Sequence, residues 1–139
     1  MTDIHELAEE LYEMASNYLK LDDKFEAIFA LENAAACVRL WRQVGPDLKI
    51  AQALALYLKS LIKVGADKEL ISALAYHAYY VAWLSGDRLL IASGLVALAR
   101  ARQGTPSFEA DYKAALESVP RVDDLTERNK LEAELAALA

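Results

Sequence analysis

Cysteine, proline and glycine are scarce in this 139-residue chain, which holds one Cys, three Pro and five Gly. The single thiol, Cys37, excludes an intramolecular disulfide, and its apolar surroundings at 34–38 indicate a small buried hydrophobe. So little Pro and Gly excludes collagen-like, linker-like and low-complexity chains. Residues that favour strands are also few, with seven Val, six Ile and three Thr against 26 Ala and 23 Leu. This composition predicts a single all-α domain.

Basic residues are outnumbered, with 15 Lys and Arg against 21 Asp and Glu and a net charge of -6. Nucleic-acid binders gain most of their affinity from basic surfaces, so we expect no nucleic-acid partner. The longest uncharged apolar stretch, Ala73 to Leu84, is shorter than the roughly 20 residues that span a bilayer, and the acidic N-terminus does not resemble a secretory signal. We therefore expect a cytoplasmic protein without a membrane partner.

Motifs for catalysis or cofactor binding are missing. The chain has no phosphate-binding glycine loop, no HExxH and no ExxH, and its two histidines, His5 and His77, lie far apart in the sequence. His5 and Glu9 share a helical face, but two side chains do not make a metal site. We expect no enzyme activity, no catalytic residue, no metal and no cofactor.

Glycine, proline and aspartate divide the chain into helix-sized segments. Asp22, Asp23 and Asp67 are expected to cap the helices that follow them, and Thr105 is expected to cap a helix that begins at Pro106. Gly94 lies inside a segment, where it predicts the close approach of another helix. The seven expected helices cover residues 3–20, 24–43, 47–63, 67–84, 87–103, 106–118 and 123–138.

An internal repeat of about 40 residues runs through the chain. Leu48, Ile50, Ala51 and Leu54 match Leu89, Ile91, Ala92 and Leu95 at an offset of 41, and Leu11, Met14, Ala15 and Tyr18 match Ala51, Leu54, Ala55 and Leu58 at an offset of 40. A unit of this length holds two helices, and a lone helical hairpin cannot hide its apolar face. The repeat therefore predicts stacked hairpins.

These units resemble the tetratricopeptide repeat. Leu11, Met14, Ala15 and Tyr18, then Ala27, Leu31 and Ala34, match the first repeat, and Tyr112, Ala115 and Pro120 match the end of the third. The middle unit departs from the pattern at His77 and Tyr80. The segments 40–58 and 83–104 look like the 40-residue variant found in arrays attached to large bacterial signalling regulators. The resemblance implies a right-handed stack of antiparallel hairpins in one domain, 1–139, with units near 3–44, 45–85 and 86–120 and a closing helix at 121–139.

The resemblance also implies a function in protein–protein interaction, as an adaptor or regulatory scaffold. Its first helices would line a concave groove in which four cations and no acid face a partner peptide with an acidic or C-terminal segment. A solvated face that binds nothing is the alternative for these cations. The residues expected along the groove are Tyr12, Ser16, Leu19, Lys20, Lys49, Gln52, Leu56, Lys59, Ser60, Leu90, Ser93, Ala97, Arg100 and Ala101.

Two other functions stay open. Tyr76, His77 and Tyr80 could line a small-ligand or enzyme site in a helical bundle, or be a core histidine among tyrosines whose hydroxyls reach solvent. A structural homodimer is the third function. The closing helix carries a stripe that comprises Val122, Leu125, Leu131, Leu135 and Leu138, which would cover the last hairpin or pair with another chain. We interpret Trp41 and Trp83, which occupy similar places in their units, as core residues.

Overall fold

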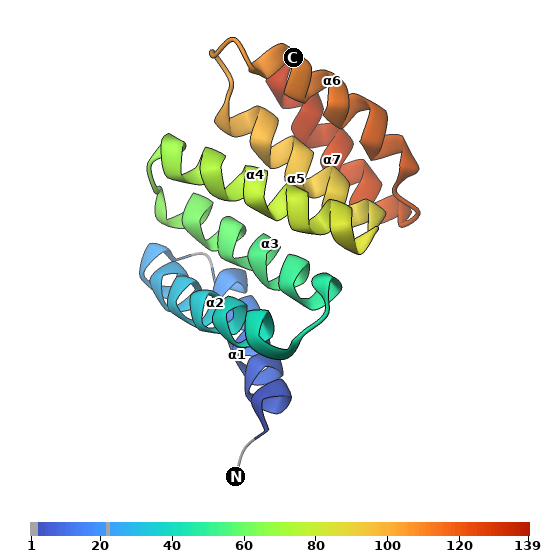
Figure 1. The fold of residues 1–139 in the computed structure, drawn as a ribbon. Coiled ribbons are helices and arrows are strands. Elements are labelled where there is room, and N and C mark those ends of the chain that lie inside the picture. Colours follow the sequence, from blue (N-terminus) through green and yellow to red (C-terminus); the bar gives the residue numbers. More distant parts are fainter. Residues whose placement is uncertain (1–2, 22) are drawn as a thin grey trace.

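The protein is all-helical in the computed structural model, which describes residues 3–21 and 23–139, with only the backbone of Lys24. Seven α-helices and one short 3-10 helix, η1, account for nearly all of this part of the chain, and no strand occurs in it (Figure 1). The elements are α1 (Ile4–Lys20), α2 (Lys24–Val44), α3 (Asp47–Val64), α4 (Lys68–Ser85), α5 (Arg88–Ala101), α6 (Phe108–Ser118), η1 (Val119–Arg121) and α7 (Leu125–Leu138).

Helix ends lie within two residues of the predicted ends. The reason is local chemistry. The predicted caps Asp23 and Asp67 accept hydrogen bonds from the backbone N–H groups of Phe25 and Glu69, at 2.9 and 3.2 Å. Gly65 ends α3 at φ 78°, a left-handed conformation that costs glycine little because it has no Cβ. The predicted cap at Asp22 lies outside the described residues.

The start of α6 differs from the prediction. Its first helical residue is Phe108, not Pro106, and its N-cap position is held by Ser107 without a side-chain hydrogen bond. The hydroxyl of Thr105 instead donates to the carbonyl oxygen of Arg102 at 2.7 Å, which closes the turn after α5. The prediction that Thr105 caps α6 was therefore wrong, because its hydroxyl donates a hydrogen bond to the end of the preceding helix.

Helices that follow one another in sequence pack against one another in space. The large interfaces join α1 to α2, α2 to α3, α3 to α4, α4 to α5 and α5 to α6. Figure 1 shows the blue α1 and the red α7 at opposite ends of the molecule. The odd-numbered helices also touch, α1 with α3, α3 with α5, and α5 with α7. One face of the molecule is therefore built from α3, α5 and α7 together.

Small side chains allow these close contacts. Ala8, Ala15 and Ala34 are fully buried, and Cys37 is buried with them, as predicted; its Sγ–H donates to the carbonyl oxygen of Ala8. Gly94 of α5 lies against α4, where a Cβ added to it would be 3.0 Å from the Cα of Tyr79. The predicted close approach at Gly94 is confirmed.

The prediction of a core position for Trp83 was wrong, and Leu125 does not share the buried stripe of α7 that was predicted. Trp41 is 4% exposed and packs in the core, but Trp83 is 59% exposed on α4. The two positions are similar in their units, but α2 also packs on α1, whereas no described helix covers the side of α4 that carries Trp83. Leu125 is likewise 58% exposed, because it begins α7 on the side away from Leu131, Leu135 and Leu138, which are buried.

No described helix combines the length and the apolar character that crossing a bilayer requires.

Candidate functional site

A hollow of about 470 Å³ lies between α3, α5 and α7, with two residues of α4 at its base. We call it the α3–α5–α7 groove. Its floor consists of small residues, which leave open a space that larger side chains would fill. Its sides are aliphatic. The small residues are Ala51, Ala55, Ala78, Ala82, Ser93, Gly94 and Ala97, and the larger apolar residues are Leu58, Ile62, Leu90, Val96 and Leu131.

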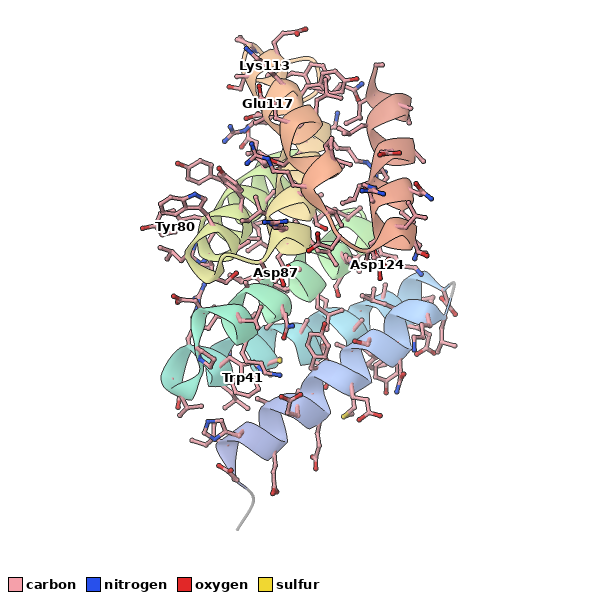
Figure 2. The ribbon with its side chains drawn as sticks, turned by 90° about the vertical axis from the view of Figure 1, so that its right-hand side faces the viewer. Trp41, Tyr80, Asp87, Lys113, Glu117 and Asp124 are labelled. Carbon is pink, nitrogen blue, oxygen red and sulfur yellow. The ribbon has the colours of Figure 1, made fainter. Side chains whose placement is uncertain are left out.

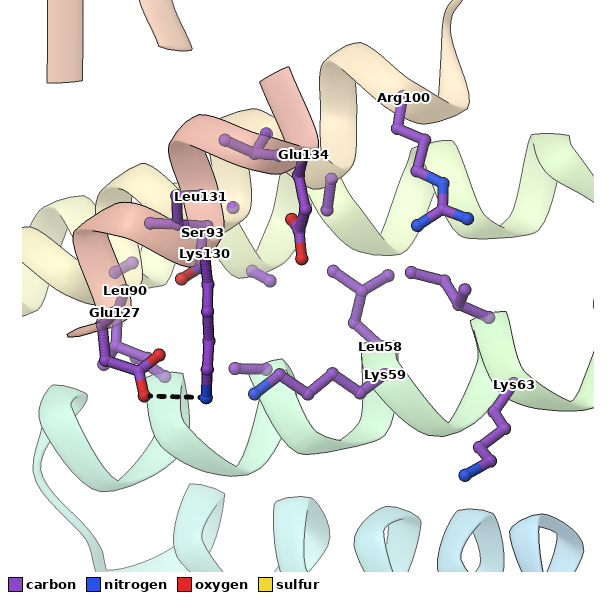
Figure 3. Close-up of a pocket in the computed structure, with 18 residues that line it drawn as sticks. Leu58, Lys59, Lys63, Leu90, Ser93, Arg100, Glu127, Lys130, Leu131 and Glu134 are labelled. Atoms are coloured by element: carbon purple, nitrogen blue, oxygen red, sulfur yellow. Dashed lines mark ion pairs between the residues drawn. The ribbon is translucent and has the colours of Figure 1, made fainter. Parts of the chain in front are cut away.

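Two cations from neighbouring helices stand at this groove. Lys59 of α3 and Arg100 of α5 both line it and are exposed (Figure 3). Within the described part of the chain, neither forms an ion pair or a side-chain hydrogen bond. The two residues predicted to occupy equivalent positions in consecutive units thus reach the same hollow with their charges uncompensated.

The opposite wall is α7, which presents charges of both signs. Glu134 and Lys130 extend from α7 into the space above α3, and Lys130 pairs with Glu127 at 3.6 Å (Figure 3). The expectation that no acid faces the groove was therefore wrong. Sequence reasoning treated α7 only as a closing helix, although the spacing i, i+3, i+4, i+7 of Glu127, Lys130, Leu131 and Glu134 indicates a shared face.

Lys63 also lines the groove, one turn after Lys59 along α3. Its ammonium donates to the carbonyl oxygens of Leu19 and Leu21, at 2.9 and 3.2 Å. These contacts connect the end of α3 to the end of α1, so Lys63 has a structural role at this site.

The other predicted groove residues of the second and third units differ in where they lie. Ser93 joins Lys59 and Arg100 in the hollow, but Lys49 pairs with Glu9 at 2.9 Å and lies over the ring of Trp41. Leu56 and Ser60 were expected to face the groove and are buried, because α3 packs on four other helices. The Ser60 hydroxyl donates to the carbonyl oxygen of Leu56 at 2.9 Å.

The first unit contributes nothing to this hollow. Tyr12 and Ser16 are half-buried and Lys20 is exposed, and none of the three lines it. Gln52 of the second unit is also half-buried and does not line it. The Ser16 hydroxyl donates to the carbonyl oxygen of Tyr12 at 2.9 Å, and burial raises the pKa of the Tyr12 phenol. Ala101 lies outside the hollow, whereas Leu90 and Ala97 line it as expected.

Tyr76, His77 and Tyr80 share α4, and none of them lines the α3–α5–α7 groove. Tyr76 and Tyr80 are exposed, and Figure 2 shows Tyr80 pointing away from the helices. Nη2 of Arg42, on α2, lies 2.6 Å from Nε2 of His77. Burial and the charge of Arg42 lower the pKa of His77, so the ring is neutral near pH 7 and can accept this hydrogen bond.

Arg102 is a residue that sequence reasoning missed. Its guanidinium donates to the Ser72 hydroxyl at 3.0 Å and to Asp111 at 3.4 Å, and it lies over the ring of Tyr76. It thereby connects α4 and α6 through the end of α5.

Comparisons with protein-family models, curated proteins and solved structures find no match to this chain. No group of three or more His, Cys, Asp or Glu side chains in the described ranges is arranged to hold a metal ion. The α3–α5–α7 groove is accordingly identified by its geometry and charge alone.

Proposed function

We propose that the chain is a non-catalytic, tetratricopeptide-like interaction module of the cytoplasm, an adaptor or regulatory scaffold whose α3–α5–α7 groove binds an acidic peptide segment of a partner protein. The observation that carries the proposal is the pair Lys59 and Arg100, two cations that have no partner among the described residues and that line one largely apolar hollow. Cations beside an apolar surface favour ligands that combine a carboxylate with an aliphatic or aromatic side chain.

The size of the hollow sets the length of the bound segment. A volume of about 470 Å³ falls within the range of small-ligand pockets and holds a few residues of peptide. An apolar side chain of the ligand would lie on the floor near Ala55 and Ala97, with a side-chain or C-terminal carboxylate at Lys59 and Arg100. Glu134 on the facing wall would repel a second acid placed there.

A displayed library of random peptides with free C-termini tests this proposal. Peptides selected on the wild-type protein are measured by fluorescence anisotropy against Lys59→Glu/Arg100→Glu. Charge-assisted hydrogen bonds contribute roughly 1.5–3 kcal/mol when desolvated and less when exposed, so the double reversal is expected to weaken binding at least tenfold. Lys68→Glu/Lys113→Glu, a reversal at two exposed positions outside the groove, should bind like the wild type.

Two further measurements belong to the same experiment. Raising the salt from about 0.1 to 1 M shortens the Debye length from about 10 to 3 Å, and this should weaken binding to the wild type. Ala55→Leu keeps every charge but fills the floor, so it should also weaken binding. The proposal is contradicted if the selected peptides are not enriched in acidic residues and bind both double variants with equal affinity. Lys59 and Arg100 would then belong to a solvated face.

A further inference from the structure

The outer side of α4 exposes an unusual set of large apolar side chains. Trp83 is 59% exposed, and Figure 2 shows the neighbouring Tyr80 pointing away from the molecule. Leu70, Tyr76, Tyr80 and Leu84 are each about half exposed, and Ala73 lies between them. We call this surface the α4 outer face, defined by Leu70, Ala73, Tyr76, Tyr80, Trp83 and Leu84.

The opposite side of the same helix is buried. Ala75, Ala78, Val81 and Ala82 pack against the helices on either side of α4, namely α3 and α5. A helix at the surface of a monomer normally has a polar outer face, whereas the segment from Leu70 to Ser85 contains no Asp, Glu, Lys or Arg. Contiguous exposed apolar surface, rich in Tyr and Trp, is typical of protein interfaces.

We propose that the α4 outer face binds the same face of a second copy of this chain, with the two α4 helices antiparallel about a two-fold axis. A two-fold contact brings a surface patch against itself, so a charged patch would repel its copy. The α4 outer face has no charged side chain of its own. The two cations at its edges are engaged within the chain, Arg42 with His77 and Arg102 with Asp111.

The face is also self-complementary in size. At 100° per residue, Ala73 and Tyr80 lie along its middle, Tyr76 and Trp83 along one edge, and Leu70 and Leu84 along the other. In an antiparallel pair centred near residues 76 and 77, Tyr80 lies against Ala73 of the second copy. The two Tyr76 side chains then meet on one edge, and on the other edge Leu84 lies against Leu70 of the second copy.

The contact is short. An α4 of 18 residues is about 27 Å long, and one strip of helix covers less than the roughly 800 Å² per partner of a standard interface. We therefore expect a reversible dimer with a micromolar rather than a nanomolar dissociation constant.

Sedimentation velocity over a wide range of protein concentrations tests for the dimer. The wild-type protein should shift from monomer to dimer mass as concentration rises, and Tyr80→Glu should stay monomeric or dimerise at least tenfold more weakly. Phe25→Glu is the matched control, because Phe25 is 75% exposed at the start of α2, away from this face. A wild type that is monomeric at every concentration overturns the proposal, as does a dimer that Phe25→Glu abolishes and Tyr80→Glu does not.

Cysteine cross-linking tests the antiparallel register, since the natural Cys37 is buried. Tyr76→Cys should form a disulfide-linked dimer, because the two positions lie near the axis. Two Leu70→Cys chains should not, since their Cα atoms would be about 20 Å apart along the helices and a disulfide needs less than about 7 Å. An equal mixture of Leu70→Cys and Leu84→Cys should cross-link. Efficient cross-linking of Leu70→Cys alone would mean a parallel arrangement and would overturn the register.

Discussion

His77 shows how one side chain can make stability depend on pH. Its ring receives a hydrogen bond from Arg42 across the gap between α2 and α4, and it can accept that bond only while the contacting nitrogen carries no proton. Burial and the guanidinium both oppose protonation, so the pKa of His77 is lower in the folded protein than in the unfolded chain.

The sign of the effect follows from proton binding. The stabilisation that neutral His77 contributes is fully present above about pH 6.5. As the pH falls below this value, the unfolded chain takes up a proton at His77 before the folded protein does, so the stabilisation decreases until the pH reaches the folded-state pKa. We predict that His77→Gln, which keeps an acceptor for Arg42, loses less thermal stability than the wild type between pH 7.5 and 5. Thermal unfolding by circular dichroism measures this. His5→Gln is the control. The prediction is contradicted if His77→Gln loses as much thermal stability over this pH range as the wild type does.

Single residues also mark where sequence reasoning reached its limit. The caps at Asp23 and Asp67 were predictable because each depends on a contact two residues away. The exposure of Trp83 was not, because α4 is apolar on every side and its periodicity does not indicate which side is covered. The contacts of Lys49 with Glu9 and of Arg102 with Ser72 join residues 40 and 30 positions apart, and no local sequence pattern predicts them.

At the scale of the helix, the contact between α4 and α5 depends on the absence of one carbon atom. A Cβ at Gly94 would lie 3.0 Å from the Cα and 3.1 Å from the Cβ of Tyr79. The Cα belongs to the backbone of a packed helix, which cannot yield without moving α4 away from α5. Glycine therefore stays in the middle of α5 although it is a poor helix former.

We predict that Gly94→Ala lowers the free energy of unfolding. Alanine gains roughly 1 kcal/mol in helix propensity, but overpacking between helices costs about 1–3 kcal/mol, and the backbone contact places this site toward the higher cost. Urea unfolding followed by circular dichroism measures the balance. Ser93→Ala, the neighbouring change on the same helix, should be neutral or stabilising. A Gly94→Ala protein more stable than the wild type would mean that α4 and α5 can separate cheaply.

Helix positions were predictable from the sequence to within two residues, but the wall that α7 contributes to the groove was not. Gly65 and Gly86 stop helices through their own left-handed conformations, which is a local property. The place of Lys130 and Glu134 above α3 depends on how α7 packs against α5, which is set by the burial of Leu131 and Leu135 against residues far earlier in the chain. The hollow therefore shares α3 and α5 with the predicted groove, whereas the prediction also included α1, which does not line the hollow, and left out α7, which does.

At the scale of the whole molecule, the core is a chain of local clusters. One cluster joins α1 to α4 through Trp41 and Leu54, and another joins α5 to α7 around Val96 and Val119. The middle helices pack on neighbours at both sides, whereas α1 and α7 pack on one side only. Stability should therefore be highest in the middle of the chain and lowest at its ends.

Native-state hydrogen exchange measures this distribution. We predict that amides in α3, α4 and α5 exchange most slowly, and that those in α1 and α7 exchange through partial openings that cost less than global unfolding. Leu135→Ala, which removes a buried side chain from α7, should speed exchange in α7 while leaving α3 nearly unchanged. Uniform protection over all helices, with Leu135→Ala accelerating every amide equally, would indicate one cooperative unit instead.

The pairing of each helix with the next one along the chain also bears on how the protein acquires its structure. Contacts between residues close in sequence require only short loops to close, and chains dominated by such contacts fold quickly. During synthesis, α1 and α2 can pack together before α3 has left the ribosome, and each later helix then finds a surface already in place. The order in which the helices are made is thus also an order in which they can assemble.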